Sequence, residues 1–257
     1  MSATLAFQPP GDTLMSWVKI YDHWWRPVVI STPRMSLPLD GATYSPALDP
    51  FLFIGLDEEL LAFVPQPVHA VILLFPCTPK YEEFCKEERQ RIDKEGQTVS
   101  NNIVFYPQTI ANACGTMGVL HSIANNWAHG GLLKLKEGGV IKNFLEKTVN
   151  LTPAERATAL EEDTTLASVH ENHASTGQTA TPDLADNVDL HFVCLVERDG
   201  HLYELDGNKP YPINHGPSSK DSFLFDAIKV AKKFVERDPE NLNFSVIAAT
   251  TAEEDDY

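Results

Sequence analysis

The sequence predicts a single α+β domain built around a largely antiparallel β-sheet. Strand-like and helix-like segments interleave along the chain, and one pair of strand-like segments is joined by a turn short enough to force an antiparallel pairing. A length of 257 residues is sufficient for one hydrophobic core that closes without a disulfide or a metal. Two small domains would also fit this length, and one domain is the simpler interpretation.

Three apolar segments are expected to form strands of this sheet. The run 68–75, VHAVILLF, is apolar almost throughout, which is typical of a strand buried on both faces. A shorter strand is expected at 103–106, and the segment 244–250, FSVIAAT, is expected to form the last strand.

A β-hairpin is the clearest local signal in the chain. The segments 191–198 and 201–206 are strand-like, and the two residues between them are Asp199 and Gly200, which favour a two-residue turn. Counting back from this turn places His191 opposite residue 208, so that Asp206 lies one diagonal step away on the same face of the sheet.

Helices are predicted from apolar residues at helical spacing and from capping residues. The central one is unusually poor in charge and is therefore expected to be buried. Another begins with Thr152, Pro153 and Glu155, which supply an N-cap, a first-turn proline and a capping-box partner. The predicted helices cover 57–64, 80–97, 115–127, 152–163 and 224–237.

Three segments are expected to lack regular structure. Residues 1–34 form an irregular, proline-containing N-terminal extension, and residues 251–257 form an acidic tail. The stretch 168–186 is rich in Ser, Thr, Gly, Gln, Asn and Pro, which indicates a long exposed loop. Loops of this length inside a domain often act as lids over a functional site.

Composition excludes several classes of protein. No apolar run approaches the ~20 residues that span a bilayer, and the N-terminus does not resemble a secretory signal, so we expect a cytoplasmic protein, with the nucleus as a further location. A net charge of −16 disfavours nucleic acid and favours a basic partner, although it also serves solubility alone. The four cysteines form no CxxC pair, so we expect neither a metal nor a cofactor.

Cys114 is the candidate nucleophile. It stands where the chain enters the charge-poor helix, and the positive end of a helix dipole stabilises a thiolate. The alternative is a buried cysteine that only packs in the core. We expect that packing role for the other three cysteines, Cys77, Cys85 and Cys194.

A nucleophilic cysteine needs a base and a third group that orients the base, and the hairpin offers both. The predicted register permits a hydrogen bond between His191 and Asp206, although an ordinary strand histidine and a turn aspartate remain open as alternatives. Gln108 precedes Cys114 by six residues and could donate its side-chain amide to an oxyanion, or simply be solvated.

Several long segments together resemble the ubiquitin carboxyl-terminal hydrolase family, most closely its small single-domain members. The likeness runs in order from about residue 57 to 250, and its segments are ELLAFVPQPVHAVILLFP, QTIANACGT, TGQTATP, DLHFVCLVERDGHLYELDG, KPYPINHG and KKFVERDP. We therefore assign residues 35–250 to a domain of this family. The preceding stretch PLDGATYSPALDPFLFIG departs from the family pattern, which usually has a tryptophan-led segment and a helix there.

The resemblance implies a papain-like cysteine peptidase fold, with helices on both faces of an antiparallel sheet and a crossover loop at about 168–186 over the active site. It implies that Cys114 is the nucleophile, His191 the general acid and base, Asp206 the residue that orients it, and Gln108 the oxyanion stabiliser. All four positions carry the residue that an active member needs.

The resemblance further implies a monomeric deubiquitinase that acts at the C-terminal glycine of ubiquitin and releases small or unfolded leaving groups. Ubiquitin's basic tail would suit the acidic chain. Two alternatives remain at this point: a protein that sequesters monomeric ubiquitin with little turnover, and a hydrolase for another ubiquitin-like modifier.

Overall fold

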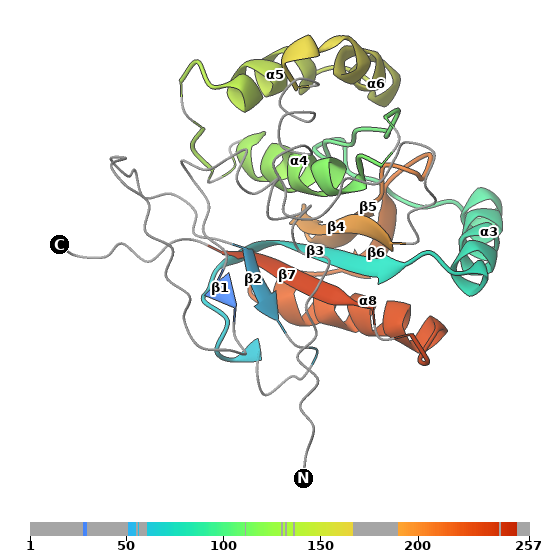
Figure 1. Cartoon of the computed structure of the whole chain (residues 1–257). Coiled ribbons are helices and arrows are strands. Elements are labelled where there is room, and N and C mark those ends of the chain that lie inside the picture. The colour runs from blue at the N-terminus through green and yellow to red at the C-terminus, as the bar shows by residue number, and fades with distance from the viewer. Residues whose placement is uncertain are drawn as a thin grey trace.

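A seven-stranded sheet with helices on both faces forms the body of the protein (Figure 1). The computed structural model describes residues 28–29, 51–54, 56, 61–110, 112–129, 131, 133–135, 137–166, 190–241 and 243–250. Within this part of the chain, no helix is long and apolar enough to cross a membrane.

The strands are arranged in the order β1-β2-β7-β3-β4-β5-β6. β1 and β2 run parallel, and every other neighbouring pair in the sheet is antiparallel. The strands are β1 Val28–Val29, β2 Phe51–Ile54, β3 Val68–Pro76, β4 Leu190–Arg198, β5 His201–Leu205, β6 Ile213–Pro217 and β7 Ser245–Thr250.

Helices cover the two faces of this sheet, as Figure 1 shows. α4 packs on one face against β3 and β4, with α5 and α6 beyond it, and α8 packs on the opposite face. α3 follows β3 at the end of the sheet. The helices are α3 Pro79–Glu95, α4 Cys114–Trp127, α5 Val140–Thr148, α6 Pro153–Glu162 and α8 Phe223–Arg237. The predicted α+β class with helices on both faces is confirmed.

β3 divides the hydrophobic core into two parts. Ala70 and Ile72 point into the cluster on the α4 side, whereas Val71, Leu73 and Phe75 point into the cluster on the α8 side. All five are almost fully buried. Successive side chains of a strand point to opposite faces, so a continuous apolar run is what a strand buried on both faces requires.

The predicted local signals at the turn and at the cap are confirmed. Asp199 and Gly200 have φ values of 51° and 79°, and the flanking strands pair Arg198 with His201. Positive φ at both central residues is the conformation that fits a two-residue hairpin turn. At the start of α6, Thr152 and Glu155 form the complete capping box.

The strand expected at 103–106 is absent, because α4 takes the place of a neighbouring strand. The Val104 N–H donates to Asn125 Oδ1 at 2.9 Å, and the Val104 carbonyl accepts from Nδ2 of the same side chain at 2.8 Å. The Tyr106 N–H similarly donates to His121 Nε2 at 3.0 Å. A buried extended backbone needs these hydrogen bonds, and here helix side chains supply them instead of a sheet.

The predicted pairing of His191 with residue 208 is also wrong. β5 ends at Leu205, which pairs with Cys194, and the chain then turns at Asp206. His191 instead pairs with Phe75 of β3. Four elements of the structure, β1, β2, β6 and α5, were not predicted from the sequence.

Several predicted segments lie outside the described residues. They are most of the helix 57–64, the crossover loop 168–186, the acidic tail 251–257, and the N-terminal extension 1–34 apart from β1.

Candidate active site

Cys114 is the first residue of α4. The first N–H groups of a helix have no intrahelical partner and mark the positive end of its dipole, so a thiol placed there is favoured as a thiolate. Asn112 precedes this start with a φ of 56°, a conformation that asparagine tolerates better than most residues. The local sequence therefore turns the chain sharply into the helix and brings the sulfur to its N-terminus.

His191 faces Asp206 across the end of the hairpin. Its Nε2 lies 2.7 Å from Asp206 Oδ1, and both side chains are buried. The Cys114 thiol lies within hydrogen-bonding reach of the same imidazole, and the two groups shift each other's pKa. The Phe75 ring packs against this imidazole, with the two ring centroids 5.7 Å apart and the ring planes nearly perpendicular. Sulfur, imidazole and carboxylate thus form one continuous array.

The protonation of this array favours a thiolate beside an imidazolium. Burial raises the pKa of the Cys114 thiol, but the hydrogen bond and positive charge of His191 more than offset this and bring the pKa below that of an ordinary thiol. Backbone hydrogen bonds from Phe192 and Gly115 act in the same direction. Burial lowers the pKa of His191, whereas Asp206 and Cys114 raise it to a net value of about 10. An ion pair of this kind activates the sulfur as a nucleophile.

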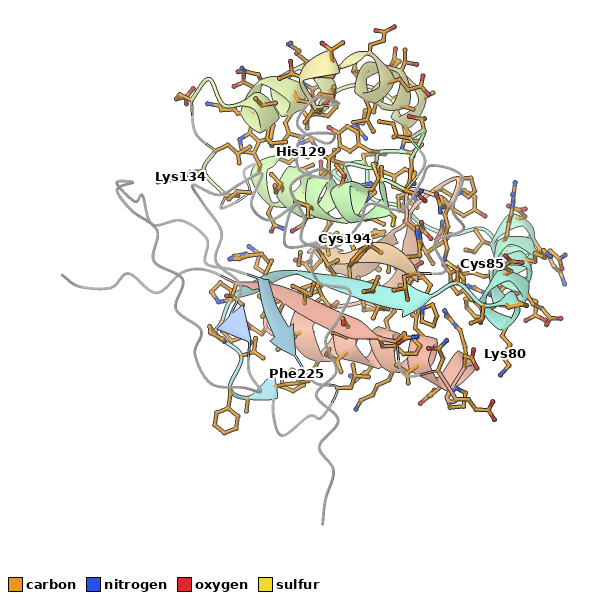
Figure 2. All side chains as sticks on the ribbon, in the orientation of Figure 1. Lys80, Cys85, His129, Lys134, Cys194 and Phe225 are labelled. Atoms are coloured by element: carbon orange, nitrogen blue, oxygen red, sulfur yellow. The ribbon has the colours of Figure 1, made fainter. Side chains whose placement is uncertain are left out.

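The other three cysteines show the opposite behaviour. Burial raises the pKa of Cys77 to about 12 and also raises the pKa values of Cys85 and Cys194. Figure 2 shows Cys194 on β4 within the sheet and Cys85 on α3. These thiols remain protonated at neutral pH, in agreement with the packing role that the sequence predicted for them.

Gln108 lies against the turn that carries the carboxylate. Its backbone N–H donates to the Gly207 carbonyl at 2.9 Å, immediately after Asp206 in the chain. Its side-chain Nε2 donates to the Ile110 carbonyl at 3.0 Å, and Oε1 is buried without a partner among the described residues. An amide nitrogen carries two protons, so one N–H of Gln108 is still available to an oxyanion.

Two residues of the site were missed by the sequence analysis. The Tyr81 hydroxyl, on α3, donates to Asp206 Oδ2 at 3.3 Å, and the Asn208 N–H donates to Oδ1 at 2.9 Å. Asn208 is two residues from Asp206 in the turn after the hairpin, so their contact could have been predicted from the local sequence. Tyr81 was not, because 125 positions separate it from Asp206.

The described residues contain no cluster of three or more His, Cys, Asp or Glu side chains that could hold a metal ion. A thiol beside an imidazole and a carboxylate is an arrangement that can carry out acyl transfer.

Comparisons with known proteins agree on one family. Residues 53–236 match the model of ubiquitin carboxyl-terminal hydrolase, family 1. The chain is 40% identical over 234 residues to a ubiquitin carboxyl-terminal hydrolase of Drosophila melanogaster, covering 90% of this chain and 99% of that one. It is 42% identical over 199 residues to ubiquitin carboxyl-terminal hydrolase isozyme L1 of Rattus norvegicus, covering 77% and 86%.

The fold is similar to a solved structure as well. The Trichinella spiralis UCH37 catalytic domain, bound to ubiquitin vinyl methyl ester, superposes with a TM-score of 0.57 at 24% identity, over 77% of this chain and 83% of that domain.

Proposed function

This chain belongs to the ubiquitin carboxyl-terminal hydrolase family 1, and from that membership we propose that it is a thiol-dependent deubiquitinase that cleaves bonds at the C-terminal glycine of ubiquitin. One observation carries the proposal: a cysteine at a helix N-terminus interacts with a histidine whose Nε2 is 2.7 Å from a buried aspartate. This is the arrangement of nucleophile, base and orienting group that thiol hydrolases need.

The first step is attack of the Cys114 thiolate on the carbonyl carbon of the terminal glycine. The imidazolium of His191 lowers the pKa of the Cys114 thiol and so favours the thiolate before substrate arrives. Attack forms a C–S bond and places negative charge on the carbonyl oxygen. The His191 imidazolium then gives its proton to the leaving nitrogen as the C–N bond breaks, which yields a thioester and a free amine.

The charge on the oxygen needs donors fixed before the reaction. Two are at hand. The backbone N–H of Cys114 belongs to the first turn of α4, where no intrahelical carbonyl accepts it. The second is the remaining side-chain N–H of Gln108.

Deacylation reverses the roles. The now neutral His191 takes a proton from water, and the resulting hydroxide attacks the thioester carbon. The C–S bond breaks and restores the thiolate beside the imidazolium, and the carboxylic acid formed on ubiquitin releases its proton to solvent and leaves as a carboxylate. Asp206 accepts from Nε2 throughout and keeps the ring oriented.

Leaving groups are proposed to be small or unfolded. The support is the family resemblance, which predicts that residues 168–186 cross the active site, and the position of this segment directly before β4, where His191 lies. The proposed partner is ubiquitin, whose basic tail would suit a chain with a net charge of −16.

A fluorogenic C-terminal amide of ubiquitin tests the proposal. The unmutated protein should release the fluorophore, and Cys114→Ala should abolish the release. Cys194→Ala is the matched control, because it removes a protonated thiol that is buried in the sheet. It should remain active, with at most a modest loss of stability.

Other outcomes would identify other functions. Binding of ubiquitin with no turnover by the unmutated protein would replace the proposal with sequestration. Turnover of a parallel substrate built on another ubiquitin-like modifier, in preference to ubiquitin, would move the specificity but leave the chemistry unchanged.

A further inference from the structure

The Asp206 carboxylate is held through both of its oxygens. Oδ1 accepts from His191 Nε2 at 2.7 Å and from the Asn208 N–H at 2.9 Å. Oδ2 accepts from the Tyr81 hydroxyl at 3.3 Å. His191 and Asn208 therefore hold Oδ1, and Tyr81 holds Oδ2. The Tyr81 hydrogen bond opposes rotation of the carboxylate about the bond that joins it to Cβ.

Tyr81 is well placed to act as a fixed donor. It is 8% exposed, and its ring packs against Phe75 and Phe234 with centroids 4.7 Å and 5.9 Å away. The phenol must donate rather than accept, because an aspartate paired with an imidazolium has no proton to give. Burial and the nearby Asp206 charge raise the pKa of Tyr81, which keeps this proton in place.

α3, which carries Tyr81, is also tied to the turn after Asp206 by an ionic contact. Glu88 lies two turns along the helix, and its Oε2 is 2.7 Å from Lys209 Nζ. The Lys209 backbone N–H in turn donates to the Asp206 carbonyl at 2.9 Å. Glu88 is buried and the Lys209 side chain is only 10% exposed, so the contact is little screened by solvent. α3 and the turn are therefore held as one unit.

We propose that Tyr81 is a positioning residue for the reaction, whose hydroxyl holds the Asp206 carboxylate in the orientation that presents Oδ1 to His191. The catalytic role of Tyr81 rests on the proposed function. Its role in orienting the Asp206 carboxylate toward His191 does not depend on that function. Tyr81 does not touch the reacting atoms; it acts through Asp206.

Removing the Tyr81 hydroxyl has two effects on the thiolate of Cys114, one electrostatic and one geometric, and they oppose each other. Loss of a donor concentrates charge on the carboxylate, which by itself would strengthen the imidazolium and favour the thiolate. Freedom of the carboxylate to rotate away from Nε2 weakens the imidazolium and disfavours the thiolate. A positioning role means that the second effect dominates, so the sign of the change identifies the role.

The experiment compares Tyr81→Phe with Tyr211→Phe in the full chain. Tyr211 donates to Asp93, an exposed carboxylate of α3, so its variant removes a tyrosine hydroxyl that is bonded to a different carboxylate of the same helix region. The rate of Cys114 alkylation by iodoacetamide is followed by mass spectrometry of its peptide across pH. Steady-state kinetics on the ubiquitin amide and thermal unfolding are measured alongside.

Tyr81→Phe is expected to move the alkylation midpoint upward by about 0.5 pH unit or more, and to lower kcat about tenfold with KM within about twofold. Tyr211→Phe is expected to match the unmutated protein. In an Asp206→Asn background, Tyr81→Phe should produce no further shift, because the residue through which it acts is already altered.

An unchanged or downward midpoint in a folded Tyr81→Phe protein would overturn the proposal, as would an equal effect in the Asp206→Asn background. Alkylation needs no ubiquitin, so an inactive unmutated protein would defeat the proposed function while the midpoint shift still decided the role of Tyr81.

Discussion

Gln108 and Gly207 are in direct backbone contact. The Gln108 N–H donates to the Gly207 carbonyl at 2.9 Å, and a Cβ built on Gly207 would lie 2.8 Å from the Gln108 Cβ. Such an approach is possible only when one residue has no side chain. The contact fixes the loop of the proposed oxyanion donor against the turn of the proposed orienting carboxylate.

Replacing Gly207 should therefore damage catalysis more than stability. In Gly207→Ala the new methyl group would also lie 3.2 Å from the Gln108 backbone nitrogen, so the two loops must separate. We expect kcat to fall about tenfold or more, because small displacements of catalytic groups are costly. Gly118→Ala is the control, since its Cβ would make ordinary contacts of 3.5 Å or more in α4. Equal kcat values for the two variants would contradict this role of Gly207.

Asp206→Asn should leave the fold intact and remove most of the activity. The amide is the size of the carboxylate but does not carry the charge that stabilises the imidazolium of His191. We expect kcat to fall by roughly 10² to 10⁴ and the alkylation midpoint of Cys114 to rise. Asp199→Asn, in the turn of the same hairpin, tests whether any lost aspartate has this effect. A kcat within a few fold of the unmutated value in Asp206→Asn would refute the orienting role.

The segment 168–186 should limit the size of the leaving group. Inserting a flexible stretch next to Gly177 should admit folded adducts that the unmutated protein rejects, while cleavage of the small fluorogenic amide remains unchanged. The measurement is the ratio of the two rates. A ratio that does not rise, in a variant with normal activity on the small substrate, would argue against a crossover loop.

Local chemistry explains how much of the site was predictable. Cys114 at a helix start, and Asp199 with Gly200 in a turn, are signals carried by neighbouring residues, and both are confirmed by the structure. The hydrogen bond of His191 to Asp206 followed from the hairpin, whose predicted register is confirmed as far as Leu205 and fails only where it was extended to residue 208. The turn at the end of β5 brings the aspartate back to the histidine, where continued strand pairing had been expected.

Nonlocal contacts explain what was missed. The strand expected at 103–106 has the right composition, but its hydrogen-bonding partners are Asn125 and His121, which sequence periodicity marks only as helix residues. The sequence pattern similarly identifies Tyr81 only as one apolar position of a surface helix. Only the packing of α3 against the hairpin turn reveals its contact with Asp206.

His121 should make the fold sensitive to acid. Its Nε2 accepts the Tyr106 N–H, so it is neutral in the folded chain, and burial lowers its pKa to about 4 from an ordinary 6.5. The unfolded chain takes up this proton near pH 6.5 and the folded chain only near pH 4, so stability is greatest above pH 6.5 and falls progressively as pH decreases to 4, by about 3 kcal/mol in all.

The test is the unfolding free energy, measured by denaturant titration at several pH values. His121→Gln keeps an acceptor for the Tyr106 N–H but cannot titrate. Its stability should fall less steeply between pH 6.5 and 4 than that of the unmutated protein, by up to about 1.4 kcal/mol per pH unit. His201→Gln, on β5, should follow the unmutated curve. Parallel curves for His121→Gln and the unmutated protein would rule out this source of acid sensitivity.

Lys209 should be the most costly single charge to remove from the described part of the chain. Its Nζ lies 2.7 Å from Glu88 and 2.6 Å from Glu204, and the second carboxylate also accepts from His215 at 2.8 Å. Lys209→Met would leave two buried carboxylates without their shared cation, at a cost of about 3 to 5 kcal/mol. A decrease in melting temperature of roughly 10 °C is the expected result. The double variant with Glu204→Gln removes one of the two carboxylate charges left without Lys209 and should recover part of the lost stability. No recovery would mean that the lysine acts by packing alone.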